Sequence, residues 1–411
     1  MSTSSPSQEE NELGFRNVVR LGYVSLFTDV STEMILGVLP FFIVRDLGAT
    51  AAILGLIEGV AEAVNYFFRV VAGVLTDRIG RRKPLVLIGY GLSSIAKPLF
   101  ALASSWSQAF AVRVVDRAGK GTRTSPRDAL ISDSIPKTQA GKAFGLHRSL
   151  DQVGAVLGPL FASLAVPLIG VRGIFSVSFL PAAAALIILL FFVSDIRGSP
   201  KQKRFFENAR LVLKRDFVLL LVVLEIFAIG AYNFSFILLK AGSLGIQDYN
   251  TISLVYTTLN LATVILGLPA GILADKIGKF SVLCLAFLVF LITSLAGMTL
   301  AGYWLYAFLI AFLFGSYQSI ADTVQRALIP DFTTPELKGT GYAIYYTLIG
   351  LGSLVANSVF GSLWTNVSPN VAFQFSMVTS AFAFVALLIF MIWRKRLDTP
   401  MVTRANASPI N

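Results

Sequence analysis

The residues of this sequence that could do chemistry are ionisable side chains inside long apolar segments. Near the N-terminus, Asp29 and Glu33 lie one helical turn apart. In the segment 51–75, Glu58 and Glu62 fall on one helical face. Each isolated charge at mid-membrane depth costs about 2.5–3.5 kcal/mol on insertion scales. These groups are therefore expected to face one another or a water-filled cavity rather than lipid.

The segment 107–132 carries the densest charge, and helical spacing places that charge on one face. Its ionisable residues fit within an arc of roughly 140°, and they are Arg113, Asp116, Arg117, Lys120, Arg123, Arg127 and Asp128. In the segment 142–166, His147, Arg148 and Asp151 also share a face. With Arg69 and Lys97, eight bases then oppose seven carboxylates in the first half of the chain. This near balance indicates a network that pairs internally while a few members exchange a proton or a substrate.

Two roles follow for this network. Burial favours the neutral form of a carboxyl group and an approaching arginine favours the ionised form, which is the physical basis of proton coupling. Imidazole suits a proton relay because it titrates near neutral pH in water. The proton-coupling candidates are Asp29, Glu33, Glu58, Glu62, Asp151 and His147. The substrate-binding candidates are Arg113, Asp116, Arg117, Arg127 and Arg148, with Tyr232, Asn233, Tyr256 and Asn260 from the second half. Alternatively, the charges form a static salt-bridge lattice and the aromatic residues pack in the core.

Composition indicates the class of protein that must position these residues. The chain has 411 residues, of which 55% are hydrophobic and 14% charged, and its mean hydropathy is +0.72. Apolar runs of 20 or more residues suit a bilayer core of roughly 30 Å. One cysteine and one histidine exclude a disulfide framework and a structural Cys/His zinc site. The net charge of +11 is typical of basic loops in a membrane protein, so we expect a lipid bilayer and no nucleic acid as partner.

Hydropathy predicts an all-α polytopic membrane protein with twelve transmembrane helices in two six-helix halves. The expected spans are 18–44, 51–75, 84–104, 107–132, 142–166, 173–194, 217–240, 250–274, 280–300, 303–328, 339–364 and 371–393. Between spans, nearly all Lys and Arg residues fall on the side of the two termini, and only Arg45 and Arg172 fall on the other. This asymmetry predicts cytoplasmic N- and C-termini.

The same pattern divides the chain into four regions. We expect an N-terminal half at 1–194, in which residues 1–13 are disordered, and a basic cytoplasmic linker at 195–216. A C-terminal half follows at 217–394, and a cytoplasmic tail at 395–411.

The two halves repeat one sequence pattern at an offset of 198 residues. The segment 73–81, GVLTDRIGR, aligns without gaps with 271–279, GILADKIGK. At the same offset, Gly141 corresponds to Gly339 and Gly154 to Gly352. Parallel repeats of this kind place a substrate site between the halves near the bilayer midplane.

The motif GVLTDRIGRRK resembles the signature of the major facilitator superfamily in the loop between its second and third helices. The match is complete in the first half and partial in the second, where Phe280 and Ser281 replace later basic residues. This resemblance implies a secondary carrier that works by alternating access. It also implies a gating role for Gly73, Asp77, Arg78, Gly80, Arg81, Arg82, Asp275 and Gly278. The alternative for the basic members is that they only fix topology.

Within the superfamily, the chain is similar to a widespread prokaryotic branch and partly to drug/metabolite proton antiporters. Gly154 and Gly158-Pro159 match the antiporter pattern of helix five. In helix four, Asp116 stands where that pattern has glutamine, and Arg117 where it has glycine. The resemblance therefore implies a proton-coupled antiporter for efflux of a small organic compound, multi-pass in the plasma or inner membrane of a prokaryote.

Three other functions stay open: organic-anion uptake or exchange through the arginine-rich fourth helix, divalent-metal transport, and a non-transporting membrane sensor. We expect no enzyme activity, because neither H-E-x-x-H nor G-x-S-x-G occurs, and no P-loop for ATP-driven transport. We expect no cofactor and no bound metal, the proton gradient as the energy source, and a monomer.

Overall fold

The computed structural model describes residues 8–196, 205–334 and 336–398. Helices account for nearly all of them, in the order α1 Gln8–Leu36, α2 Leu39–Arg45, α3 Ala51–Ile79, α4 Lys83–Leu99, α5 Trp106–Asp133, α6 Ala140–Val177, α7 Phe179–Phe191, α8 Phe205–Val212, α9 Arg215–Gly230, α10 Ser235–Ser243, α11 Tyr249–Ile277, α12 Lys279–Thr299, α13 Tyr306–Leu328, α14 Lys338–Asn366 and α15 Pro369–Asp398. Short 3-10 turns lie at Phe100–Leu102, Lys137–Gln139 and Ile329–Phe332.

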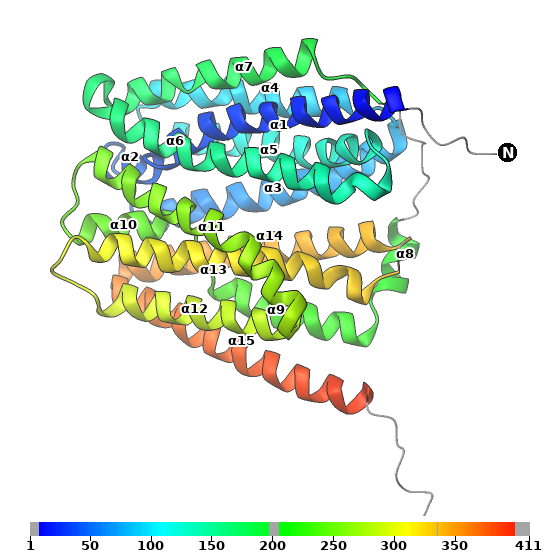
Figure 1. The fold of residues 1–411 in the computed structure, drawn as a ribbon. Helices are drawn as coiled ribbons and strands as arrows, with labels where there is room; N and C mark the ends of the chain where they lie inside the picture. The colour runs from blue at the N-terminus through cyan, green and yellow to red at the C-terminus, as the bar shows by residue number, and fades with distance from the viewer. Residues whose placement is uncertain (1–7, 197–204, 335, 399–411) are drawn as a thin grey trace, which may run out of the picture.

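The helices form two bundles that lie side by side, α1–α7 and α9–α15 (Figure 1). The short helix α8 lies at the end of the molecule where α1 begins and α15 ends. We call this end the terminal face and the other end the opposite face. The linker expected at 195–216 contains α8, and its residues 197–204 are outside the described part of the chain.

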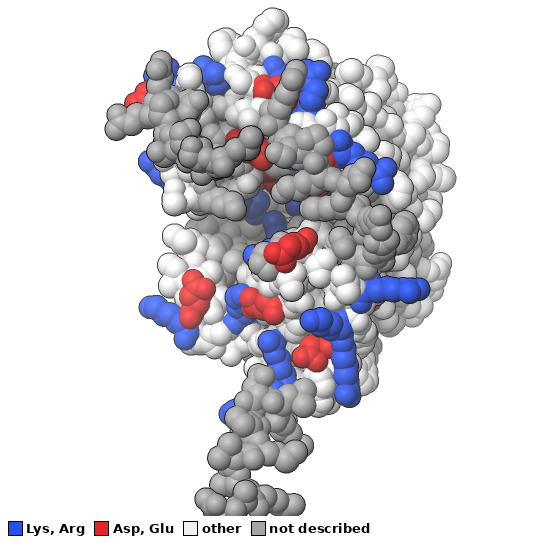
Figure 2. Space-filling view, turned by 90° about the vertical axis from the view of Figure 1, so that its right-hand side faces the viewer, with Lys and Arg blue, Asp and Glu red and all other residues white. Residues whose placement is uncertain are grey.

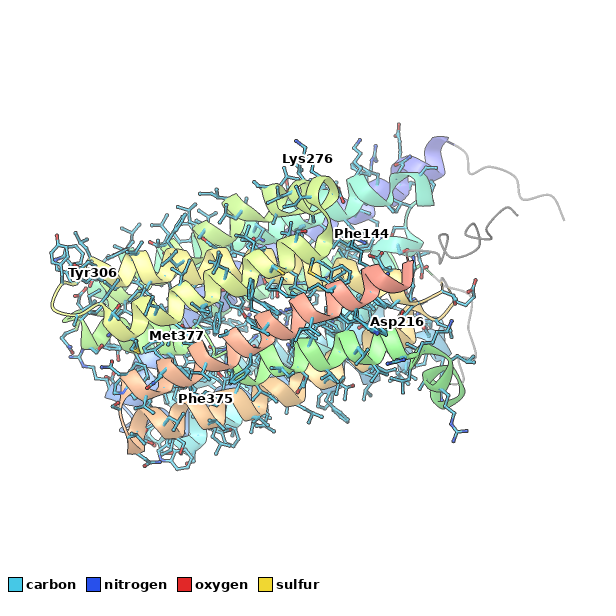
Figure 3. All side chains as sticks on the ribbon, turned by 90° about the horizontal axis from the view of Figure 1, so that it is seen from below. Phe144, Asp216, Lys276, Tyr306, Phe375 and Met377 are labelled. Carbon is cyan, nitrogen blue, oxygen red and sulfur yellow. The ribbon has the colours of Figure 1, made fainter. Side chains whose placement is uncertain are left out.

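Ten candidate spans in the described part of the chain are long and apolar enough to cross a membrane, which confirms the all-α polytopic fold. One of them, Ala140–Phe191, has 52 residues and turns back at Gly170, whose φ of 69° is left-handed. The helix α5 is missing from the ten because of its charges. Large apolar side chains stay exposed on the outer surface, such as Phe382 at 66% on α15, whose side of the molecule faces the viewer in Figure 3.

One expected boundary was wrong, and two of the expected spans, although each is a single candidate span, contain a helix break. The first helix begins at Gln8, so residues 8–13 are helical rather than disordered, and Glu12 pairs with Arg16 one turn later; residues 1–7 lie outside the described part. The span expected at 18–44 breaks between α1 and α2, where Pro40 at the start of α2 lacks a backbone N–H.

The third difference is a break in the span expected at 217–240, between α9 and α10. A broken helix inside a membrane must satisfy the backbone groups it frees. Asn357 on α14 accepts a hydrogen bond from the backbone N–H of Asn233 at 2.8 Å, and the Asn233 side chain accepts one from Ser235 N–H at 2.9 Å. These amide side chains replace the missing helical bonds.

The two halves meet at the opposite face, where small residues let helices α3 and α14 cross closely. A Cβ atom on Gly55 would overlap the carbonyl oxygen of Asn357, and one on Gly361 would overlap that of Ala51. On the other side of the interface, the Ser253 hydroxyl of α11 donates to the Pro159 carbonyl of α6 at 2.7 Å. The opposite face is therefore closed by direct contact between the halves.

We expect Gly55→Val to open this contact. Overpacking costs about 1–3 kcal/mol, which would shift a two-state equilibrium roughly 5- to 150-fold. The measurement is the maleimide labelling rate of Ser253→Cys, a buried position, in a Cys284→Ser background. The matched control is Gly91→Val, because a Cβ on Gly91 meets nothing within 4 Å. Equal labelling rates in the two variants would contradict a closed opposite face.

Candidate functional site

A cavity of about 410 Å³ lies between the two halves. Helices α1, α3, α5 and α6 line one wall with charged side chains, and α9, α11, α13 and α14 line the other with aromatic and amide side chains. The lining bases are Arg69, Arg117, Lys120, Arg123, Arg127, Arg148 and Arg326, and the lining carboxylates are Asp29, Glu33, Glu62, Asp151 and Asp322. The cavity lining thus contains seven bases and five carboxylates, nearly all of them on the N-terminal wall.

The cavity continues toward the terminal face. A second chamber of about 550 Å³ shares Arg69 and Arg326 with the first and reaches Asp77 and Gly339 near that face. Figure 2 looks onto the terminal face, which is hollowed between the two halves, with Lys and Arg atoms visible inside the hollow. Because the opposite face is closed, the cavity is accessible from one end of the molecule only.

Most predicted site residues line this cavity, and four do not. Of the proton-coupling candidates, Asp29, Glu33, Glu62 and Asp151 line it; of the substrate-binding candidates, Arg117, Arg127, Arg148, Tyr232, Asn233, Tyr256 and Asn260 line it. Arg113, Asp116 and Glu58 are buried behind the charged wall, and His147 is buried on α6 outside the cavity lining.

The buried trio behind the wall forms an ion-pair cluster between α3 and α5. Arg113 Nη2 lies 2.7 Å from Glu58 Oε2, and both side chains are at most 1% exposed. Asp116 lies 3.7 Å from Arg113 and accepts a hydrogen bond from Ser93 on α4 at 2.5 Å. These partners fix α3, α4 and α5 against one another.

Two carboxyl groups of different helices meet in the charged wall. Asp29 on α1 and Asp151 on α6 both line this wall, and the two helices pack closely here, since a Cβ on Gly154 of α6 would lie 3.1 Å from the Asp29 Cβ. Asp151 accepts a hydrogen bond from the Ser25 hydroxyl, one turn before Asp29, at 2.7 Å and lies 3.1 Å from Arg148 Nη1. Two carboxyl groups of neighbouring helices are thus exposed to the same accessible cavity, where a proton on one of them would relieve their repulsion.

A third carboxylate connects the two halves. Glu33 on α1 accepts a hydrogen bond from the Tyr256 hydroxyl of α11 at 2.6 Å and a longer one from Asn260 at 3.5 Å. Asn260 also donates to the Ala155 carbonyl of α6 at 2.8 Å. A hydrogen bond to an ionised carboxylate is roughly twice as strong as a neutral one, so this contact depends on the charge of Glu33.

Several residues that line the cavity are not among the site residues predicted from the sequence. Tyr66 lies one turn after Glu62 on α3 and stacks on Tyr346 of α14, with ring centroids 5.6 Å apart. Arg69 covers the same Tyr346 ring at 4.1 Å. The signal that could have found both residues is the helical face that Glu62 defines.

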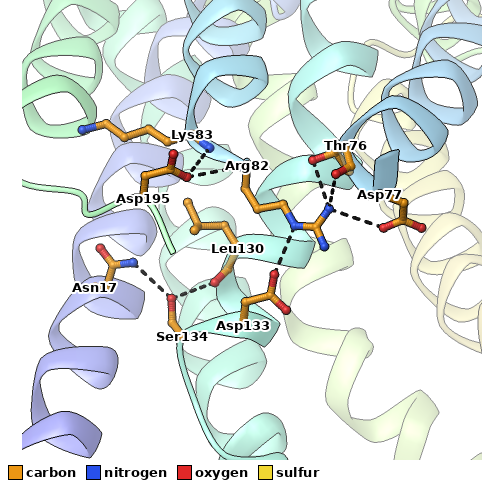
Figure 4. A network of polar contacts seen from close by, with 9 residues as sticks. All are labelled: Asn17, Thr76, Asp77, Arg82, Lys83, Leu130, Asp133, Ser134 and Asp195. Carbon is orange, nitrogen blue, oxygen red and sulfur yellow. Dashed lines mark hydrogen bonds and ion pairs between the residues drawn. The ribbon is translucent and has the colours of Figure 1, made fainter. Parts of the chain in front are cut away.

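The predicted gating motif occupies the terminal face, within the first half (Figure 4). Arg82 donates to the Thr76 carbonyl at 2.6 Å and lies 3.1 Å from Asp133 and 3.4 Å from Asp77. Asp195 accepts hydrogen bonds from the backbone N–H groups of Arg82 and Lys83 at 3.2 and 3.0 Å. The network fastens the end of α3 and the start of α4 to the end of α5 and the first residues after α7.

Two glycines of the motif end their helices with a positive φ, a conformation that favours glycine. The turn of the second half also keeps an ion pair with the aspartate at the repeat position. Gly80 ends α3 with a left-handed φ of 70°, and Gly278 ends α11 with a φ of 91°. Lys279 pairs with Asp331 at 2.7 Å, and Asp331 is the repeat equivalent of Asp133 at the offset of 198.

The remaining motif residues lie around these turns. Gly73 and Arg78 line the second chamber, Arg81 lies 3.3 Å from Asp195, and Asp275 is exposed near the end of α11.

The comparisons with known proteins agree with this architecture. The family model of the Major Facilitator Superfamily matches residues 21–249 and 218–409. The chain is 32% identical over 390 residues to the MFS-type transporter MJ1317 of Methanocaldococcus jannaschii, covering 93% of this chain and 96% of that protein. It is 25% identical over 393 residues to the multidrug resistance protein MdtG of Proteus mirabilis, covering 91% and 93%.

Solved structures show the same fold at low identity. A POT family transporter in complex with 5-aminolevulinic acid matches with a TM-score of 0.76 at 12% identity, covering 93% of this chain and 97% of that one. The nucleoside transporter NupG matches with a TM-score of 0.70 at 12% identity, covering 92% and 99%. The family model matches both halves of the chain, and the 32% identical relative covers 93% of it. This chain therefore belongs to the Major Facilitator Superfamily of membrane transporters.

Proposed function

We propose that this protein is a proton-coupled secondary transporter that moves a small organic compound by alternating access. The observation that carries the proposal is the pair of carboxyl groups Asp29 and Asp151, on the closely packed helices α1 and α6, which lines a cavity accessible from one end only. Proton exchange at this pair changes the charge of the wall against which a substrate binds. The basic terminal face is cytoplasmic in this proposal, so the described conformation is open to the cell interior.

The hydrogen bond between Glu33 and Tyr256 supports a mechanism in which the charge of Glu33 influences which end of the cavity is open. This hydrogen bond helps to hold the halves together on the closed side of the cavity. A proton on Glu33 weakens it, because a neutral acceptor forms a weaker bond than a carboxylate. Opening of the opposite face then becomes easier when Glu33 is neutral, and a rocking motion of the two halves exposes the cavity on that side.

Two alternatives follow for the direction of transport and the class of substrate. Export is supported by the relatives that are named multidrug resistance proteins, such as MdtG of Proteus mirabilis. Uptake or exchange of an organic anion is favoured by the surplus of bases in the cavity.

The test is proton movement driven by substrate in proteoliposomes that contain the purified full-length chain and an internal pH-sensitive dye. Three compounds are added outside: tetraphenylphosphonium as a cation, 1-naphthylacetate as an anion and glycylphenylalanine as a zwitterion. We expect one of them to change the internal pH at a rate above that of protein-free vesicles. No change with any charge class, in vesicles shown to retain an imposed pH gradient, would contradict proton-coupled transport of small organic compounds.

A further inference from the structure

The charged wall of the cavity contains an ammonium group without a partner. Lys120 of α5 lines the cavity, and among the described residues its side chain has no hydrogen bond and no ion pair within 4 Å. The nearby carboxylates are already bonded to other groups. Glu33 accepts from Tyr256, and Glu62 accepts from Asn65 at 3.1 Å. An ammonium group has three donors, so an unpaired one facing a cavity is available to a ligand.

Two arginines of the same helix face add spare donors on either side of Lys120. Arg117 is 2% exposed, its Nε has no hydrogen-bond partner among the described residues, and its ion pair with Glu62 is long at 3.7 Å. Arg123 is 3% exposed and stacks over Tyr90 at 4.6 Å, and its Nη1 also lacks a partner. Buried guanidinium donors without acceptors are costly, so this surface is built to receive an acceptor.

The opposite wall indicates the rest of the ligand. Phe234 and Tyr256 lie 4.8 Å apart, and Phe314 and Tyr317 lie 5.5 Å apart, and all four rings line the cavity. Aromatic rings favour apolar and aromatic groups of a ligand. A cation would instead meet a wall on which bases outnumber carboxylates.

We propose that the cavity binds a small organic anion, with its carboxylate-type or phosphonate-type group on Arg117, Lys120 and Arg123 and its apolar or aromatic body on the C-terminal wall. The proposal rests on the proton-coupled transport proposed above and adds the substrate class. It also fixes the sense of coupling, because an ionised carboxylate of the wall competes with the substrate for the same bases. Binding of a proton and binding of the anion therefore favour each other, and both move in the same direction.

The groups that face Lys120 support this sense of coupling. Carboxylates come from two neighbouring helices, Asp29 and Glu33 on α1 and Glu62 on α3. The other charged and titratable groups in or next to the cavity are Lys97 on α4, Tyr66 and Arg69 on α3, Arg127 on α5, Arg148 and Asp151 on α6, Tyr232 after α9, Tyr256 on α11, Tyr317, Asp322 and Arg326 on α13, and Tyr345 on α14. Neutralising any of the three carboxylates makes the surroundings of Lys120 more positive and favours an anion.

The experiment measures thermal unfolding of the detergent-purified full-length chain with three matched probes at pH 6 and pH 8. The probes are 1-naphthylacetate, the neutral 1-naphthylacetamide and the cationic 1-naphthylmethylammonium. We expect the anion alone to raise the melting temperature, with tighter binding at pH 6. Loss of one charged hydrogen-bonding partner weakens binding roughly 10- to 100-fold. The Lys120→Gln variant should therefore need a roughly 10- to 100-fold higher concentration of the anion for the same rise in melting temperature.

Two further variants keep the result interpretable. Lys120→Arg retains the charge and should retain most of the anion response even if Lys120→Gln folds poorly. Lys142→Gln removes an exposed lysine on α6, outside the cavity, and should leave the response unchanged. Stabilisation by the ammonium probe, tighter anion binding at pH 8, an unchanged response in Lys120→Gln, or no response to any probe would each overturn the proposal.

Failure of this proposal is distinguishable from failure of proton-coupled transport. If proteoliposomes move protons with tetraphenylphosphonium, coupling stands and the anionic substrate class is wrong. If 1-naphthylacetate binds through Lys120 and moves no protons in vesicles, the substrate class stands and the coupling is wrong.

Discussion

Replacing Arg113 by methionine is expected to lower the free energy of unfolding by about 3–5 kcal/mol, because removing one member of a buried ion pair leaves the other charge unpaired. Glu58 is 0% exposed, and its second carboxylate oxygen already has no hydrogen-bond partner among the described residues. Without Arg113, at 2.7 Å, Glu58 would lose its closest cation. Reversible unfolding in mixed detergent micelles measures the change.

Two controls separate this loss from a general effect of removing arginine. Arg16→Met breaks an exposed pair with Glu12 at 3.9 Å and should cost less than about 1 kcal/mol. The double variant Glu58→Leu/Arg113→Met removes both charges and should recover most of the stability. A stable Arg113→Met variant that no longer binds substrate would instead support the sequence-based hypothesis that Arg113 binds substrate.

The second large effect concerns the carboxyl pair. In the proposed mechanism Asp29 and Asp151 bind the coupled proton, and Asp29→Asn replaces one of these two carboxyl groups by an amide that cannot take up or release a proton at these pH values. A pH difference of one unit supplies about 1.36 kcal/mol per proton, which supports an accumulation of about tenfold. We expect the wild type to approach this accumulation of a transported probe, and Asp29→Asn to stay near onefold.

The measurement is accumulation of a labelled probe in proteoliposomes under an imposed pH gradient, with exchange at equal pH as the second readout. Exchange of labelled for unlabelled probe at equal pH needs no net movement of protons, so it should continue in Asp29→Asn. The matched control is Asp248→Asn, which keeps a good helix cap at α11, where Asp248 accepts a hydrogen bond from Thr251 N–H at 2.8 Å. Accumulation by Asp29→Asn equal to that of the wild type would exclude the pair as the coupling site.

The sequence predicts the fold and the charged wall for a clear physical reason. Charge is costly in lipid, so the helical faces that carry Asp29, Glu62 and Asp151 must turn inward, and they do meet at the cavity. The repeat at offset 198 likewise predicts two similar halves, and the equivalent residues Asp133 and Asp331 each pair with a basic residue of the motif turn, Arg82 in the first half and Lys279 in the second.

The sequence could not predict which residues of one helical face reach the cavity and which are buried behind its wall. Arg113 and Arg117 lie on the same face of α5, one turn apart, yet Arg113 is enclosed behind the wall and Arg117 reaches the cavity. Spacing gives the direction of a side chain and not the position of the neighbouring helix. The hydrogen bond between Glu33 and Tyr256 joins residues 223 positions apart and needs three-dimensional packing to be seen.

Helix breaks were hidden for a related reason. The segment 217–240 is predominantly apolar, and its break at Asn233 depends on Asn357 of α14 supplying an acceptor. A hydropathy pattern contains no information on a partner 124 residues away.

In the proposed mechanism the two ends of the cavity open alternately, and the charge of Glu33 biases which end is open. Spin-label distances test it directly in a Cys284→Ser background, since the chain has one cysteine. One label pair, Lys142→Cys with Lys276→Cys, spans the terminal face between α6 and α11. The other, Asp46→Cys with Gln247→Cys, spans the opposite face, where Arg45 donates to the Gln247 carbonyl.

We expect Glu33→Gln to shorten the terminal-face distance and lengthen the opposite-face distance. Weakening a charge-assisted hydrogen bond by about 1.4 kcal/mol would change the ratio of the two populations roughly tenfold. Distances that change in the same direction at both faces, or at neither face, would contradict alternating access controlled by Glu33.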